Sequence, residues 1–206
     1  MKPVEQKIYL ASKSPRRRAL LRQIGVDFEV LVLRDSTYKG AEVSEFVNEG
    51  ETPEAYVSRV TREKAEYGRQ IMLWRRLPPR PVLAADTTVT ADGRILGKPA
   101  GKAEAIEMLK FLSGRTHQVL TSIVVSHNQK AWQATQTSEV TFADLSDELI
   151  NAYCSTQEPY DKAGGYAVQG QAAIFIPKIV GSYSGIMGLP LFETAQLLRE
   201  AGIRIL

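Results

Sequence analysis

Residues 7–18 read KIYLASKSPRRR and change within one short stretch from a strand pattern to a helix start. The β-prone residues 7–11 predict a strand, and Ser14 followed by Pro15 supplies a helix N-cap with proline at the first helical position. The apolar residues that follow recur at helical spacing and stop at Gly25, which tolerates the left-handed conformation of a helix C-cap. This stretch therefore predicts a strand–turn–helix unit.

Strand and helix patterns alternate along the rest of the chain. We expect strands over 81–85, 116–126, 132–142 and 173–180, a hairpin turn at 92–93, helices over 53–73, 102–112 and 191–201, a short helix from Ser146, an acidic loop over 34–53, an exposed connection over 74–81 and a glycine-rich loop over 162–170. Strands interleaved with helices, together with an antiparallel pair, predict an α/β fold in which helices flank a mixed twisted sheet. Residues 1–206 should form a single domain.

The composition narrows the class of protein. The chain has 206 residues, 44% of them hydrophobic, which is enough for one domain with a sizeable core. Its formal charge of +3 and pI near 8.9 fit a small anionic ligand better than stable binding to nucleic acid. The single cysteine, Cys154, cannot form an internal disulfide, and no apolar run predicts a signal peptide or a membrane span. We expect a cytoplasmic protein without membrane or nucleic-acid partners, in which Cys154 is packed rather than reactive.

Three arginines follow Pro15 in the first turn of the expected helix. The helix macrodipole disfavours cations there, and a bound anion would resolve the conflict, because free backbone N–H groups and guanidinium groups together form a phosphate site. Removing Arg16 or Arg17 is then expected to weaken triphosphate binding and to leave stability unchanged or raised without ligand. The alternatives are a solvated basic turn and a Ser-Pro-Arg kinase or targeting motif.

Two further charged residues lie in apolar surroundings. Lys64 falls on the apolar stripe of the helix over 53–73, so its side chain should point inward or into a cleft, unless it extends to the surface. Asp86 directly follows the apolar run 82–85, and ligands of open α/β sheets collect at the carboxyl ends of strands. A carboxylate there can bind a metal or activate water. A turn-capping aspartate is the alternative.

Other residues carry weaker signals. Lys98, in the segment 97–99, would direct another charge at a phosphate if the hairpin returns it to the same cleft. Gln169 lies in the glycine-rich loop and has both a donor and an acceptor with which to read the edge of a pyrimidine, although such loop amides are often only solvated. His117 and His127 are scattered, so a zinc site is not expected. The absence of a GxxxxGK[ST] loop and of a GxSxG elbow argues against P-loop kinases and α/β-hydrolases.

These features outline a site for nucleotide phosphates, and a series of motifs in the same order resembles the Maf family. The resemblance extends over almost the whole chain. The similar segments are LASKSPRR (10–17), REKA (62–65), ADT (85–87), GKP (97–99), SGRTH (113–117), EPYDKAG (158–164), YAVQG (166–170), GSY (181–183) and GLPL (188–191).

The resemblance implies a Maf/inosine-triphosphatase-like fold, usually a homodimer, and an enzyme that cleaves nucleoside triphosphates to the monophosphate and pyrophosphate with a divalent metal cation, Mg²⁺ or Mn²⁺. Asp86 matches the family's proton acceptor. Arg16, Thr87 and Gln169 match the positions that separate a branch acting on dTTP and UTP from a branch acting on 7-methyl-GTP. Thr87 and Gln169, together with the segment 181–183, favour dTTP and UTP.

One acidic segment departs from the family pattern. The family often carries DIDE after its second strand, whereas this chain has a longer loop that contains EVSE at 42–45. We match Glu45 to the last acid of that segment, as a metal ligand together with Asp86. The ion would then bridge phosphate oxygens and carboxylates, because a hard octahedral cation prefers oxygen ligands to the scattered histidines.

The mechanism expected from these residues relies mainly on charge. Asp86 would orient and deprotonate the water that attacks the α-phosphorus, without a covalent enzyme intermediate. The alternatives are a 7-methyl-GTP pyrophosphatase and a non-catalytic nucleotide-binding regulator of septation. The side chains expected to hold the triphosphate are Ser14, Arg16, Arg17, Lys64 and Lys98.

Overall fold

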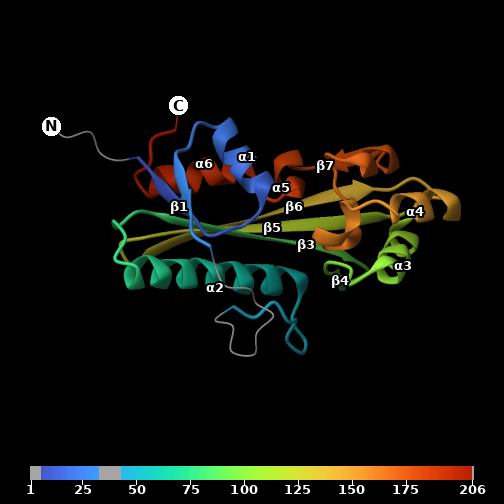
Figure 1. Ribbon diagram of the computed structural model, residues 1–206, viewed down its shortest axis with the longest axis horizontal. Coiled ribbons are helices and arrows are strands. Elements are labelled where there is room, and N and C mark those ends of the chain that lie inside the picture. The colour runs from blue at the N-terminus through green and yellow to red at the C-terminus, as the bar shows by residue number, and fades with distance from the viewer. Residues whose placement is uncertain (1–5, 33–42, 206) are drawn as a thin grey trace.

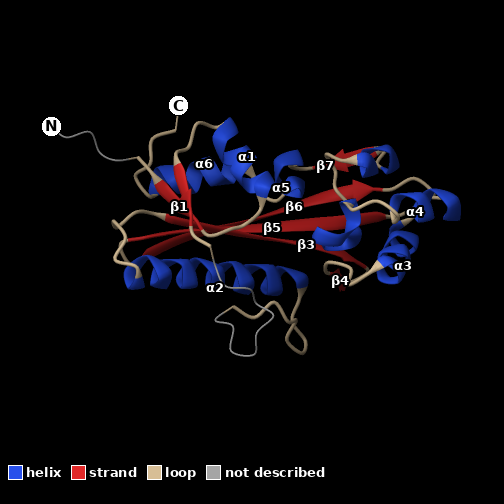
Figure 2. Ribbon diagram, in the orientation of Figure 1, coloured by secondary structure: helices blue, strands red, loops and turns tan. Residues whose placement is uncertain are grey.

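The computed structural model describes residues 6–32 and 43–205, so part of the expected acidic loop, including Glu42, lies outside the described residues. In the described ranges the strands form one seven-stranded mixed sheet with the order β2–β1–β3–β5–β6–β7, and β4 pairs with β3 (Figure 2). β1 is parallel to β2 and β3, whereas β3, β5, β6 and β7 are each antiparallel to the next. The strands span Ile8–Leu10 (β1), Phe28–Val30 (β2), Val82–Ala91 (β3), Arg94–Leu96 (β4), Thr116–His127 (β5), Lys130–Thr141 (β6) and Lys178–Val180 (β7).

Helices cover both faces of this sheet, which confirms the expected α/β class. Figure 1 shows α2 against one face, α1, α5 and α6 against the other, and α3 and α4 at one end. None of the helices in the described ranges is long and apolar enough to cross a lipid bilayer. The helices span Pro15–Gln23 (α1), Pro53–Trp74 (α2), Lys102–Leu112 (α3), Asp147–Tyr153 (α4), Tyr183–Met187 (α5) and Leu191–Glu200 (α6), and the 3₁₀ helices span Glu158–Asp161 (η1), Ala163–Gly165 (η2) and Gln171–Phe175 (η3).

The strand–turn–helix unit expected near the start of the chain is confirmed. β1 lies between β2 and β3, and Ser14 Oγ caps α1 by accepting a hydrogen bond from the N–H of Arg17 at 3.4 Å. Pro15 is the first helical residue, and Gly25 follows the helix with a φ of 70°. The other long helices and the antiparallel pair β5–β6 begin and end within two residues of their expected bounds.

Side chains alternate along β3 between two hydrophobic cores. Val82 and Ala84 are buried with Val60 and other residues of α2, whereas Leu83 and Ala85 are buried with residues of α1 and α6. Successive residues of a strand point to opposite faces of the sheet. The polar residues that come next on β3 therefore also point alternately towards α2 and towards α1.

β3 is longer than its sequence pattern predicts. The pattern predicts a strand over 81–85 that ends before Asp86, but β3 runs to Ala91, and Asp86 lies in its middle, paired with Ser122 of β5. The strand continues because the following residues are mostly β-branched and β5 offers each of them a partner as far as Thr90. The prediction of a strand end at Asp86 is therefore wrong.

One edge of β3 is nevertheless open beside Asp86. On that side β1 pairs with β3 only at Val82 and Leu83, and β4 pairs with β3 only from Val89 onwards. No strand in the described part of the chain pairs with the intervening residues on that side. The strand end at which a ligand could collect is therefore the carboxyl end of β1. Because β1 ends there, the polar middle of β3 is accessible.

The strand expected over 173–180 is wrong in its first half, where the chain forms η3 and only the short β7 pairs with β6. The carboxylate of Glu158 explains the difference. It accepts hydrogen bonds from the N–H groups of Gln171 and Ala172 at 2.9 and 3.2 Å. Because a side chain satisfies these backbone groups, the segment turns instead of joining the sheet.

Gly164 fixes the glycine-rich loop against β3. Its φ is 70°, its N–H donates to the carbonyl of Gly97 at 3.0 Å, and a Cβ built on it would lie 3.0 Å from the side chain of Val89. Both the left-handed conformation and the filled space require glycine there. Gly202, after α6, also has a positive φ of 88°, but nothing lies within 4 Å of such a Cβ.

Gly164→Ala should therefore cost more stability than Gly202→Ala. We expect Gly202→Ala to lower the free energy of unfolding by about 1 kcal/mol, the cost of placing a Cβ on a left-handed residue. Gly164→Ala should lower it by about 2–4 kcal/mol, because contact with Val89 adds to that cost. Urea unfolding of both variants measures the difference. Equal losses would show that backbone conformation alone requires glycine.

Candidate active site

The open edge of β3 borders a cavity of about 840 Å³, a size typical of small-ligand sites. Its wall is formed by the β1–α1 loop, α2, β3, the end of β4, the loop that follows η1 and the end of α5. The cavity brings together all the residues that the sequence analysis proposed for a site: Ser14, Arg16, Arg17, Glu45, Lys64, Asp86, Thr87, Lys98 and Gln169.

Lys64 lies between two carboxylates of this cavity. Its Nζ is 2.7 Å from Asp86 Oδ1 and 2.7 Å from Glu45 Oε1, and the side chains of Lys64 and Asp86 are each 15% exposed. The prediction that Lys64 points inward is confirmed. Burial alone would lower the pKa of Lys64, but the two carboxylates outweigh it and the pKa is raised. At Glu45 burial alone would raise the pKa, but Lys64 and other nearby cations outweigh it and the pKa is lowered, so Lys64 and Glu45 both favour their charged forms.

The loop that carries Glu45 is anchored to α2. Arg59 donates to the carbonyls of Ser44 and Phe46 at 3.0 and 2.9 Å, and Tyr56 Oη donates to the carbonyl of Glu45 at 3.0 Å. These bonds satisfy successive carbonyl groups of a segment without regular secondary structure. Sequence reasoning missed both α2 residues, because an arginine and a tyrosine on a helix give no local sign of which loop they will meet.

The two carboxylates fit a hard divalent cation. In residues 6–32 and 43–205, no group of three or more His, Cys, Asp or Glu side chains is arranged to hold a metal ion. Mg²⁺ needs fewer protein ligands, because it is often bound by one or two carboxylates together with water and substrate phosphates. Glu45 and Asp86 converge on the same ammonium group and supply oxygen donors. This donor set suits an ion that binds together with a phosphorylated ligand.

Arg17 joins three parts of the chain around the cavity. Its Nε donates to the carbonyl of Gly188 at 2.7 Å, its Nη1 to Ser12 Oγ at 3.2 Å and its Nη2 to Thr87 Oγ1 at 3.2 Å. Burial lowers the pKa of Arg17, and the charge of Asp86 opposes that shift, so the guanidinium stays protonated. Arg17 is therefore a structural tie, and of the five N–H groups of a guanidinium two remain for a ligand.

Thr87 extends this tie across the sheet. Its Oγ1 lies 2.9 Å from Oγ1 of Thr121 on β5, which donates to the carbonyl of Gly185 in α5 at 2.8 Å. A Cβ at Gly188, where φ is 114°, would lie 3.4 Å from Thr87 Oγ1 and 3.5 Å from Arg17 Nε. The hydroxyl of Thr87, a position that the family resemblance links to substrate choice, is thus used within the protein.

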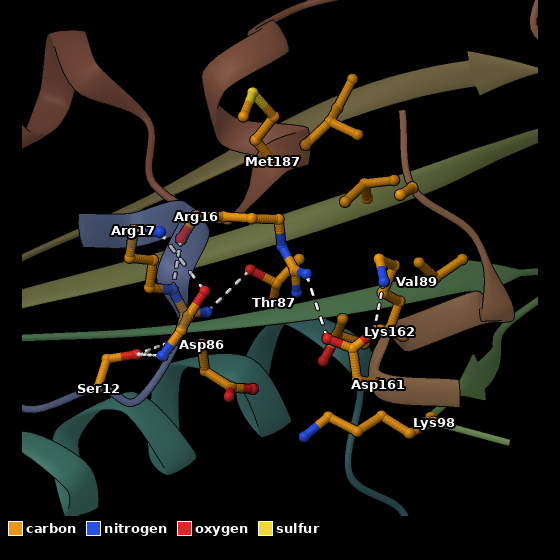
Figure 3. A pocket seen from close by; sticks show the side chains of 18 of the residues that line it. Ser12, Arg16, Arg17, Asp86, Thr87, Val89, Lys98, Asp161, Lys162 and Met187 are labelled. Carbon is orange, nitrogen blue, oxygen red and sulfur yellow. Dashed lines mark hydrogen bonds and ion pairs between the residues drawn. The ribbon is translucent and has the colours of Figure 1, made fainter. Parts of the chain in front are cut away.

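Arg16 reaches across the cavity to Asp161 of η1 (Figure 3). Its Nη1 lies 3.4 Å from Asp161 Oδ2, and its side chain is 25% exposed. Lys162 Nζ contacts the other carboxylate oxygen of Asp161 and donates to the carbonyl of Glu158 at 2.7 Å. Sequence reasoning did not include Asp161 or Lys162 in the site. The only available signal was their place in the EPYDKAG segment.

Another part of the cavity wall is apolar. Val89, Ile186 and Met187 line it together with Tyr166, whose Oη lies 2.8 Å from Nε2 of the buried His117. Burial lowers the pKa of His117 to about 4, so the ring is neutral near pH 7. Because the hydroxyl of Tyr166 is paired inside the protein, the wall suits the flat faces of a nucleobase.

Gln169 is exposed at the cavity and is carried by an anchored loop. The Glu158 carboxylate that holds the start of η3 also accepts a hydrogen bond from Tyr153 Oη at 3.0 Å. A Cβ at Gly170 would lie 2.4 Å from that carboxylate, so glycine is needed for this close approach. The amide of Gln169 is therefore presented to the cavity from a defined position, and its role in reading a base stays a prediction.

The comparison with known proteins agrees with this geometry. A family model described as "Maf-like protein" matches residues 7–201. The chain belongs to the Maf family. It is 53% identical to the "dTTP/UTP pyrophosphatase" of Aromatoleum aromaticum over 98% of each chain. It is 48% identical to the protein of that name from Dechloromonas aromatica, over 96% of this chain and 98% of the relative. The "Nucleoside triphosphate pyrophosphatase" of Haemophilus ducreyi is 44% identical over 98% of this chain and 99% of its own.

The Maf match and the cavity concern the same residues. The matched range, 7–201, contains every residue that lines the cavity, from Ala11 to Gly188.

Cys154 lies elsewhere, buried at the end of α4, and burial raises the pKa of its thiol. The interpretation of this cysteine as a packed residue is confirmed.

Arg17→Ala and Arg16→Ala should differ in their effect on the stability of this Maf protein without nucleotide. Arg17→Ala removes three hydrogen bonds of a partly buried cation, so we expect the free energy of unfolding to fall by about 2–4 kcal/mol. Arg16→Ala removes one long, partly exposed ion pair and should cost less than about 1 kcal/mol. This corrects, for Arg17, the expectation of unchanged or raised stability. Urea unfolding measures both, and a small loss in Arg17→Ala would contradict its role as a tie.

Proposed function

We propose that this chain is a nucleoside triphosphate pyrophosphatase that hydrolyses dTTP and UTP to the monophosphate and pyrophosphate. One observation carries the proposal: a single cavity holds the partly buried ion pair of Asp86 and Lys64, further cations and an apolar wall. A triphosphate, its attacking water and a nucleobase need these three kinds of surface. The choice of dTTP and UTP is supported by relatives with that name, one of them 53% identical to this chain.

The triphosphate would lie on the cationic side of the cavity. Lys64 and Lys98 line this side, Arg17 retains N–H groups, and Ser14 marks the N-terminus of α1, where the helix dipole favours an anion. Positive groups held in place before the reaction stabilise the charge that develops on the phosphate oxygens in the transition state. The protein thus contributes most of its catalysis through charge and position.

Asp86 would accept the proton of the attacking water. Its carboxylate lines the cavity and is held at 2.7 Å by Lys64. The water oxygen forms a bond to the α-phosphorus, its proton passes to Asp86, and the bond from that phosphorus to the bridging oxygen breaks as pyrophosphate leaves. Water supplies the oxygen that the monophosphate gains, so no covalent enzyme intermediate is required.

Glu45 and Asp86 would hold the divalent cation, Mg²⁺ or Mn²⁺, that the family resemblance implies. When bound, such an ion supplies positive charge that offsets the charge of the phosphate oxygens. The support is the convergence of the two carboxylates on Lys64 and the anchoring of the Glu45 loop to α2 by Tyr56 and Arg59. Lys64 holds these two carboxylates close together, which a cation site requires.

Hydrolysis of 7-methyl-GTP is the less favoured candidate. Its base is cationic and would need an unpaired acid in the base-binding part of the cavity. Asp161 is an acid that lines the cavity and that the sequence pattern did not indicate, but Arg16 and Lys162 offset its negative charge. Gln169 adds a neutral amide with a donor and an acceptor. Both features suit an uncharged pyrimidine.

A cytoplasmic homodimer without nucleic-acid or membrane partners completes the proposal. The single, buried cysteine is compatible with reducing surroundings, and the net charge of +3 is too small for a dedicated nucleic-acid surface. The dimer rests on the resemblance to the Maf family. Light scattering of the purified protein tests it, and a monomer mass would exclude it.

A comparison of nucleotides tests the proposed activity. With Mg²⁺ and detection of pyrophosphate, dTTP and UTP should each exceed 7-methyl-GTP in kcat/KM by at least about tenfold, equivalent to roughly 1.4 kcal/mol of differential transition-state binding. A preference for 7-methyl-GTP would move the chain to the other branch. Binding of nucleotides without release of pyrophosphate would favour a regulator that only binds them.

Asp86→Asn tests the proton acceptor. The change is nearly isosteric and leaves Lys64 paired with Glu45, so thermal melts should stay close to those of the wild type. We expect kcat for UTP to fall by about two to four orders of magnitude, because the amide cannot accept the proton of water. Full turnover by a folded Asp86→Asn protein at saturating Mg²⁺ would remove this residue from the chemistry.

A further inference from the structure

The ion pair between Arg16 and Asp161 has a third member. Lys162 Nζ contacts Asp161 Oδ1, while Arg16 Nη1 lies 3.4 Å from Asp161 Oδ2, so the carboxylate stands between two cations (Figure 3). All three residues line the cavity. The side chain of Lys162 is 14% exposed and is fixed further by its bond to the carbonyl of Glu158. The protein itself therefore assembles these three groups, which we call the Arg16–Asp161–Lys162 array.

The array presents a donor, an acceptor and a donor in that order. A carboxylate only accepts hydrogen bonds and has two acceptor sites on each oxygen, whereas guanidinium and ammonium groups only donate. Arg16 uses one N–H group in the array, and Lys162 uses two of the three on its ammonium, so both retain donors. Burial alone would raise the pKa of Asp161, but Lys162 and Arg16 keep it below its ordinary value. Asp161 is therefore an acceptor at neutral pH.

We propose that the Arg16–Asp161–Lys162 array reads the imide edge of uracil and thymine, an inference that rests on the proposed function. That edge carries the N3–H group between two carbonyl oxygens and so presents an acceptor, a donor and an acceptor. Arg16 and Lys162 donate to the carbonyl oxygens, and Asp161 accepts from N3–H. The methyl group of thymine lies on C5, away from this edge, so UTP and dTTP present the same pattern.

Cytosine presents a mismatched edge to the same array. Its N3 is an acceptor, and its exocyclic amine replaces one carbonyl oxygen. The N3 lone pair would face the carboxylate of Asp161, and the amine would face a cation. Charged groups that lose their partners in this way reject a wrong ligand far more strongly than an apolar pocket does. The array therefore selects UTP over CTP, two nucleotides that differ only at this edge.

A role of Asp161 towards phosphate would have a different effect. If Asp161 only neutralised Arg16 near the triphosphate, its negative charge would weaken the binding of every nucleoside triphosphate to the same degree, because all carry the same phosphates. If Asp161 reads the base instead, its replacement changes the ratio of kcat/KM between UTP and CTP. This ratio separates the two roles.

The decisive variant is Asp161→Asn, compared with the wild type on UTP and CTP. The amide keeps the shape of the side chain but can turn its NH₂ group towards N3 of cytosine. We expect the wild-type kcat/KM for UTP to exceed that for CTP by at least about tenfold, and this ratio to fall by at least about tenfold in Asp161→Asn.

Asp147→Asn is the matched control. Asp147 is 67% exposed and paired with Lys110 at 2.8 Å, whereas Asp161 is 63% exposed. Asp147 is not among the residues of the cavity wall. The control makes the same chemical change at an exposed ion pair, so it should keep the wild-type ratio between UTP and CTP.

Binding of UMP and CMP, measured by titration calorimetry, gives a readout that needs no hydrolysis. UMP should bind to the wild type at least about tenfold more tightly than CMP, and Asp161→Asn should remove this preference. Equal affinity of the wild type for both bases, an unchanged ratio in Asp161→Asn, or a uniform change for both bases would overturn the role of the array. A wild type that prefers UMP but hydrolyses no triphosphate would overturn the proposed function alone.

Discussion

The cavity depends on the hydrogen bonds that the guanidinium of Arg17 donates. This group ties the β1–α1 loop, β3 and the end of α5 together through Ser12, Thr87 and Gly188. A planar cation with five N–H groups can serve acceptors in several fixed directions, which the ammonium group of a lysine does less well. The guanidinium is partly buried, and three of its N–H groups are used by these acceptors. The three segments, far apart in the sequence, therefore form one wall whose shape is set by the protein.

The interruption of strand pairing beside β3 opens polar and charged side chains of this strand to the cavity. β1 stops pairing after Leu83 and β4 begins only at Val89, so the intervening edge of β3 is open. Side chains alternate across a strand, and at this edge both faces border the same cavity. Asp86 meets Lys64 of α2 on one face, and Thr87 meets Arg17 of α1 on the other. A continuous sheet would have separated these two groups, whereas the gap lets one ligand contact both.

Opposite charges are paired in two places in the cavity. One place has two carboxylates to one cation, and the other has two cations to one carboxylate. Lys64 is one cation between the carboxylates of Asp86 and Glu45, whereas Asp161 is one carboxylate between two cations. The first arrangement leaves net negative charge where a cation and phosphates would bind together. The second leaves positive charge and donors where carbonyl oxygens of a base would bind. Pairing holds these groups in position and limits the cost of burying their charge.

The sequence by itself determined the local elements and the identity of most of the site. Ser14 and Pro15 start α1, glycines end helices, and Arg16, Lys64 and Asp86 stand out because local forces disfavour them there; these signals act over a few residues, so sequence reasoning reads them. Only the tertiary structure decided what these residues meet. β5 carries β3 past Asp86, Arg17 is bound by distant acceptors, and Asp161 and Lys162 enter the cavity from η1. Such contacts depend on strand pairing and packing between segments far apart in the chain, and no local pattern encodes them.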